Sequence, residues 1–95
     1  LMNVTIFEVG PRDGLQNEST TLPLEDRVAM ITGLWKAGVR ECEIGAFVRP
    51  DRVPQMADTQ DVWARLGTPP AKTQLWFLVP NLKGLERAIA AKVKN

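Results

Sequence analysis

The chain alternates between short apolar runs and longer segments in which apolar residues recur every three or four positions. The apolar runs predict three strands, over residues 4–9 (VTIFEV), 39–47 (VRECEIGAF) and 74–79 (QLWFLV). The segments with helical spacing predict three helices, over residues 23–37, 57–66 and 82–93. Strict alternation of strands and helices predicts βαβ units, and therefore an α/β fold with a parallel sheet and right-handed crossovers.

Helix-boundary signals support the first predicted helix. Pro23 suits a first helical position, and Glu25 and Asp26 fall in the first turn, where the helix dipole favours carboxylates. Gly38 is a typical stop signal after the last turn. One apolar stripe runs along this helix, and a second runs along the last helix: Leu24, Val28, Ile31 and Trp35, then Leu82, Leu85, Ile89 and Val93. Asp58 or Thr59 is expected to cap the middle helix.

The predicted strands differ in the faces that they expose. Glu41 and Glu43 share one face of the second strand, so that face is either wet or provides partners for both carboxylates. The third strand is nearly continuously apolar, which predicts burial on both faces. The three tryptophans, at positions 35, 63 and 76, are expected in the core or in sheet packing.

Three βα units are few for a finished α/β domain. A closed α/β barrel takes eight strands, and an open doubly wound sheet usually has five or more. Three strands covered on one side would leave a sheet face and two edges unprotected. We therefore expect residues 1–95 to be one part of a larger domain, or to complete themselves by association.

Composition limits the chemistry more than it indicates a partner. The net charge of +1 gives no reason to expect nucleic acid or an acidic membrane surface as a partner. A spanning apolar stretch of ~20 residues and a secretory signal are both lacking in the sequence, and a cytoplasmic location is expected. The chain has 95 residues and no histidine, so its own residues cannot supply an imidazole as a base or metal ligand.

The loop PRDGLQN, residues 11–17, carries the first candidate chemistry. One interpretation is a tight turn between two strands, which Pro, Asp and Gly in this order favour. The other is a strand-to-helix loop, because a polar segment and a helix follow; in α/β folds such loops bind ligands. In that case Asp13 is a candidate oxygen ligand for a divalent cation, and Arg12 is a candidate for holding an oxyanion or carboxylate.

Two carboxylates and one thiol are weaker candidates. Glu43 lies on the strand expected beside the first one, where it would orient Arg12 through a charge-assisted hydrogen bond or form a purely structural ion pair. Glu8 is a similar but weaker candidate. Cys42, on the opposite face from Glu43, is expected to be a small buried hydrophobic residue rather than a nucleophile.

Three motifs in order resemble the 3-hydroxy-3-methylglutaryl-coenzyme A (HMG-CoA) lyase family. They are EVGPRDGLQNE (residues 8–18), FVRPDRVPQMAD (47–58) and VPNLKGLERAIAA (79–91). The resemblance implies a TIM (β/α)8 barrel, of which residues 1–95 would be a partial domain formed by the first three of eight strand–helix units. The tail AAKVKN and the segment WFLVPNL depart from the usual family pattern.

The resemblance also implies an activity and a set of residues. It implies cleavage of HMG-CoA to acetyl-CoA and acetoacetate, in leucine degradation, by a homo-oligomeric enzyme that needs Mg²⁺ or Mn²⁺. Asp13 would bind the cation, Arg12 would stabilise the enolate oxygen, and Glu43 and Gln16 would support them. The family's metal-binding histidines and its mobile cysteine lie in later strands, so this chain would be inactive alone. Two alternatives are a non-catalytic, self-associating protein derived from a partial barrel, and a related acyl-CoA aldolase or lyase.

Overall fold

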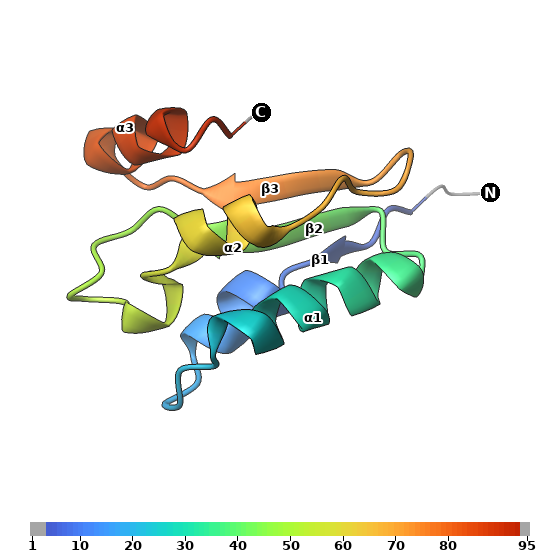
Figure 1. Ribbon diagram of the computed structural model, residues 1–95, viewed down its shortest axis with the longest axis horizontal. Helices are drawn as coiled ribbons and strands as arrows, with labels where there is room; N and C mark the ends of the chain where they lie inside the picture. The colour runs from blue at the N-terminus through green and yellow to red at the C-terminus, as the bar shows by residue number, and fades with distance from the viewer. Residues whose placement is uncertain (1–3, 94–95) are drawn as a thin grey trace.

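A three-stranded parallel sheet forms the centre of the protein. The computed structural model describes residues 4–93, and its strands are β1 (Phe7–Glu8), β2 (Glu41–Ala46) and β3 (Gln74–Leu78). They lie in the order β1-β2-β3 and all pair in parallel (Figure 1). The predicted α/β fold with parallel strands is therefore confirmed.

Three helices connect or follow the strands: α1 (Leu24–Lys36), α2 (Thr59–Arg65) and α3 (Leu82–Ala90). In Figure 1, α2 lies in front of the sheet, α1 runs below β1, and α3 lies next to β3. A π-helical turn, Gly10–Gly14, follows β1, and a short 3-10 helix, Pro54–Met56, precedes α2. Within residues 4–93, no helix has the length and apolar character needed to cross a membrane.

The elements are shorter than the sequence pattern predicts, for local reasons. β1 is two residues long rather than 4–9, because β2 pairs only with Phe7 and Glu8. α3 ends at Ala90 rather than 93, and Lys92 has a φ of 61°, which does not continue a right-handed helix. The stop predicted at Gly38 has a similar basis, since its φ of 95° suits glycine alone.

The core lies between β2 and the helices. It consists of five buried residues from three elements: Ile31, Trp35, Cys42, Ile44 and Val62. Cys42 and Ile44 are completely buried on the β2 face that the helices cover, whereas Glu41 and Glu43 on the other face are only partly buried. This alternation follows the period of two along the strand.

One burial prediction is wrong, and a second apolar surface is also exposed. β3 is not buried on both faces, since Trp76 remains 43% exposed with its ring nitrogen donating to Glu41 at 3.0 Å. The apolar stripe of α3 is also exposed, with Leu82 at 69% and Ile89 at 66%. The exposure of Trp76 and that of the α3 stripe have one cause. Within residues 4–93 the sheet has a single helical layer, so neither the exposed face of β3 nor the α3 stripe has a further layer against which to pack.

Candidate active site

The candidate site lies just past the end of β1, beside the middle of β2. After β1 the chain forms the π-helical turn Gly10–Gly14, in which the carbonyl of Val9 accepts from the amides of Arg12, Asp13 and Gly14 at 2.7–3.2 Å. The chain then continues into α1 and not into a second antiparallel strand. The hairpin interpretation of PRDG is therefore wrong, and the strand-to-helix interpretation holds.

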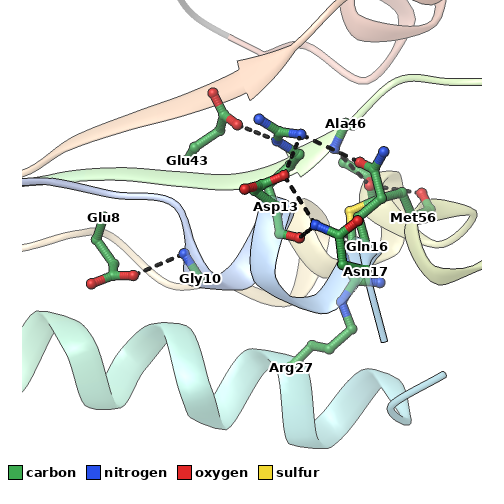
Figure 2. Close-up of polar contacts among 11 residues, drawn as sticks. Glu8, Gly10, Asp13, Gln16, Asn17, Arg27, Glu43, Ala46 and Met56 are labelled. Atoms are coloured by element: carbon green, nitrogen blue, oxygen red, sulfur yellow. Dashed lines mark hydrogen bonds and ion pairs between the residues drawn. The ribbon is translucent and has the colours of Figure 1, made fainter. Parts of the chain in front are cut away.

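An ion pair between Arg12 and Glu43 is the centre of the site (Figure 2). The Arg12 Nε donates to Glu43 Oε1, and both side chains are shielded, with 18% and 14% exposed. Parallel pairing places the end of β1 beside β2, which is why residues 31 positions apart in sequence meet. Longer contacts of 3.5 Å join Arg12 Nη1 to Asp13 Oδ1 and to Gln16 Oε1. The predicted residues Arg12, Asp13, Gln16 and Glu43 thus lie together.

Asp13 is the member of this cluster most open to solvent, with 52% of its side chain exposed. Its backbone carbonyl and Oδ1 accept from Asn17 Nδ2 at 2.9 and 3.4 Å. An exposed carboxylate on a well-bonded loop fits a hard cation such as Mg²⁺, which is often held by one or two carboxylates and several waters. Residues 4–93 contain no group of three or more Cys, Asp or Glu that could hold a metal ion, so Asp13 fits as one ligand of an incomplete set.

Glu8 and Cys42 lie on the other face of the sheet. Glu8 Oε1 accepts from the backbone amide of Gly10 at 2.8 Å, and its carboxylate lies apart from those of Asp13 and Glu43 (Figure 2). Burial, followed by the nearby carboxylates of Glu8 and Glu43, raises the pKa of the Cys42 thiol to about 11. A thiol with a raised pKa is a poor nucleophile at neutral pH.

Sequence reasoning missed the buried cation Arg27. Its side chain is 1% exposed, forms an ion pair with Asp58, and lies 4.0 Å from the Met56 sulfur. Burial lowers the pKa of this guanidinium. The signal was present, because Arg27 follows Leu24 by three positions and precedes Ile31 by four, so it falls within the apolar stripe of α1.

Thr59 connects the segment that precedes α2 to the end of β2. Its hydroxyl accepts from the Ala46 amide at 3.2 Å and donates to the Met56 carbonyl at 2.8 Å. The predicted capping of α2 is confirmed in position only, since Asp58 is the N-cap residue but its side chain makes no cap hydrogen bond. Gly45 packs so closely on Thr59 that an added Cβ would lie 2.6 Å from Thr59 Cγ2.

A second link joins the loops that follow β1 and β2. Gln55 Nε2 donates to the carbonyl of Glu18 at 2.7 Å. The β2–α2 loop is thus held to the β1–α1 loop at the sheet edge where the cluster lies. The register of β2 also shifts between Glu43 and Gly45, an irregularity of the kind that often re-aims side chains near functional sites.

Comparison with known proteins assigns this arrangement to a family. Residues 3–95 match the model of the HMGL-like family, and the chain belongs to that family. It is 44% identical over 92 residues to a 3-hydroxy-3-isohexenylglutaryl-CoA/hydroxymethylglutaryl-CoA lyase of Pseudomonas aeruginosa, across 97% of this chain and 30% of that protein. It is 47% identical over 87 residues to a hydroxymethylglutaryl-CoA lyase of Pseudomonas mevalonii, across 90% of this chain and 28% of that protein.

Solved structures agree with the sequence matches. A crystal structure of hydroxymethylglutaryl-CoA lyase from Pseudomonas aeruginosa has a TM-score of 0.90 and 42% identity, across 96% of this chain and 30% of that chain. An HMG-CoA lyase from Acinetobacter baumannii, in complex with coenzyme A and 3-methylmalate, has a TM-score of 0.86 and 36% identity, across 93% and 28%. The chain thus spans about 30% of the length of these relatives. The expected fold, three βα units of an incomplete TIM barrel, is confirmed.

Proposed function

We propose that this chain contributes the first part of a carbon–carbon lyase active site that cleaves HMG-CoA to acetyl-CoA and acetoacetate, a step of leucine degradation. The observation that carries the proposal is the Arg12–Glu43 pair beside Asp13, just past the carboxyl end of β1 and next to the parallel strand β2, in an HMGL-like chain. Ligand sites in α/β barrels lie at this end of the strands.

Arg12 has the properties needed to stabilise a developing enolate. When the carbon–carbon bond breaks, negative charge moves onto the oxygen of the departing acetyl-CoA unit. A guanidinium that Glu43 already holds in place needs little reorganisation to meet that charge, and fixed charge in a shielded site stabilises a transition state most effectively. Gln16 restrains the remaining side of the guanidinium through its contact with Nη1.

Asp13 would supply one oxygen ligand to Mg²⁺ or Mn²⁺. When bound, such a cation polarises substrate oxygens and favours loss of the hydroxyl proton. Because the chain contains no histidine, imidazole ligands or an imidazole base would come from other parts of the protein. We further propose a homo-oligomeric, cytoplasmic enzyme; relatives with the lyase name include both mitochondrial and cytoplasmic proteins.

The test is a lyase assay that detects acetoacetate from HMG-CoA and Mg²⁺. The purified chain should give no turnover alone, and turnover should appear when it is mixed with the part of the Pseudomonas aeruginosa lyase beyond the matched third. The substitution Arg12→Met should lower the restored kcat by about 10²–10³-fold, the typical effect of losing one oxyanion donor. Substantial turnover by the chain alone would contradict the need for groups outside it.

The substrate could differ in its acyl branch within the same reaction type. The Pseudomonas aeruginosa relative carries two substrates in its name, 3-hydroxy-3-isohexenylglutaryl-CoA and hydroxymethylglutaryl-CoA. The cluster around Arg12 would act on the parts that these substrates share. Comparing the kcat/KM of the two substrates in the restored mixture tests this alternative directly.

A second candidate function is self-association without catalysis. The observation that favours it is the exposed apolar surface, which includes Val4 and Ile6 beside β1 and the stripe of Leu82, Leu85 and Ile89 on α3. Light scattering on the purified chain decides between self-association without catalysis and the incomplete lyase. A monodisperse oligomer favours this alternative, whereas a folded monomer that aggregates as its concentration rises favours the incomplete lyase.

A further inference from the structure

Glu8 lies where an α/β protein usually places an apolar residue. It pairs in register with Cys42, on the sheet face that the helices cover, and it is half-buried. A carboxylate in that layer is costly unless it has a partner. Within residues 4–93, Glu8 forms no ion pair with a lysine or arginine, and its hydrogen-bond partner is the backbone amide of Gly10, at 2.8 Å.

The Gly10 amide is the one N–H of the π-helical turn Gly10–Gly14 that no carbonyl of the turn accepts from. The carbonyl of Val9 accepts from three of the turn's amides, at 3.1, 2.7 and 3.2 Å, and Pro11 has no N–H to donate. Gly10 N–H remains, because the first amides of any helical turn have no carbonyl within the turn to bond. The Glu8 carboxylate accepts from it, so every N–H of the turn is bonded.

Gly10 and Glu8 are matched in shape as well as in bonding. An added Cβ at position 10 would lie 2.8 Å from Glu8 Oε1 and 3.4 Å from the Met30 Cε on α1. The carboxylate therefore occupies the space that a side chain at position 10 would need. Glycine at this position leaves room for the carboxylate to reach the amide.

The bonded amide is only two positions before Arg12 and three before Asp13, within the same turn. We propose that Glu8 is a positioning residue, which fixes this turn through the Gly10 N–H and so sets the geometry in which Arg12 meets Glu43. The effect depends on a hydrogen-bond acceptor at Glu8 and not on its charge. Its consequence for catalysis rests on the proposed function, but its consequence for the Arg12–Glu43 contact does not.

Two substitutions separate the acceptor from the charge. Glu8→Gln keeps a side-chain carbonyl of the same reach and removes the charge, whereas Glu8→Met keeps the length and removes both. Methionine suits the apolar layer that faces α1, so this variant should remain folded. Glu86→Ala, at an exposed position on α3, is the control for loss of a carboxylate elsewhere.

The measurement is ¹H–¹⁵N NMR on the 95-residue chain, with hydrogen exchange of the Gly10 amide and the chemical shift of the Arg12 Nε–H as readouts. Glu8→Met should speed Gly10 exchange about tenfold, the equivalent of one hydrogen bond, and should move the Arg12 Nε–H resonance towards that of free arginine. Glu8→Gln and Glu86→Ala should leave both readouts near those of the unsubstituted chain.

Either of two results overturns the proposal. If Glu8→Met speeds Gly10 exchange and leaves the Arg12 resonance in place, Glu8 only completes the turn. If Glu8→Gln shifts the Arg12 resonance, the charge matters, and this variant decides the point even if the methionine variant does not fold. In the restored lyase mixture, Glu8→Met should lower kcat with little change in KM; if the mixture has no activity, the proposed reaction fails while the NMR result stands.

Discussion

Removal of either member of the Arg27–Asp58 ion pair should have unequal effects on stability. The two side chains are in different surroundings: Arg27 is 1% exposed, whereas 30% of the Asp58 side chain is exposed. Asp58→Ala would leave a guanidinium buried without a counter-charge. Arg27→Met would leave a carboxylate that water can still reach, and the methionine would fill much of the vacated space next to Met56.

The expected magnitudes follow from this difference. Leaving a charge buried without its partner typically costs about 3–5 kcal/mol, and we expect Asp58→Ala to fall in that range. Replacing a buried charge by an apolar residue of similar size is often nearly neutral, so Arg27→Met should cost about 1 kcal/mol or less. The double substitution should therefore be more stable than Asp58→Ala alone. Since small domains have only ~5–15 kcal/mol in total, the difference is large.

Urea unfolding followed by circular dichroism at 222 nm measures these free energies. Asp61→Ala is the matched control, because Asp61 lies in the first turn of α2, close after Asp58 in the sequence, but does not pair with Arg27 in the structure. It should cost about 0.3–1 kcal/mol, the usual effect of an acid near a helix N-terminus. The reasoning is refuted if Asp58→Ala costs no more than Asp61→Ala, or if Arg27→Met costs more than Asp58→Ala.

Three further predictions concern the core, the site edge and the exposed surface. The Cys42 thiol keeps its proton in the folded chain up to about pH 11 but loses it near pH 9.0 when the chain is unfolded. The free energy of unfolding should therefore fall by about 2–3 kcal/mol between those pH values. Cys42→Ala should remove that part of the decline in urea titrations carried out at several pH values. Gly45→Ala should lower the free energy of unfolding by about 1–3 kcal/mol in the same assay, because the new methyl group meets Thr59. Gly67→Ala is the control, since a Cβ there would have no neighbour within 4 Å. A cost for Gly45→Ala no greater than that of the control would contradict this prediction. Ile89→Lys should reduce aggregation measured by light scattering with little change in the free energy of unfolding, because Ile89 is 66% exposed; a loss above about 1 kcal/mol would show that it packs inside the fold.

The features that the sequence predicted well are those set by local periodicity. The alternation of residues in β2 placed Cys42 in the core and both glutamates on the opposite face, as observed. Parallel pairing then required Glu43 to lie beside the loop that follows β1, so its approach to Arg12 could be expected before any coordinates. The strand-to-helix character of that loop also followed from the polar segment and helix after it.

The features that the sequence did not predict depend on packing between segments that are far apart along the chain. The burial of Arg27 depends on Asp58 and Met56, which are about 30 positions away and lie on a loop without periodicity. The exposure of Trp76 and of the α3 stripe depends on which layers surround them, and no local pattern contains that information. Asp58 or Thr59 was expected to cap α2, but the Thr59 hydroxyl bonds the end of β2, where glycine at position 45 leaves room for the Thr59 side chain.

The central claim is that Arg12, held by Glu43 beside Asp13, is the catalytic part that this chain contributes to a lyase. The most direct test is a chimera in which this chain replaces the matched third of the Pseudomonas aeruginosa lyase. We predict cleavage of HMG-CoA within about tenfold of the parent rate, and a kcat about 10²–10³-fold lower after Arg12→Met. A folded chimera that does not cleave HMG-CoA, or one that keeps full activity after Arg12→Met, would contradict the claim.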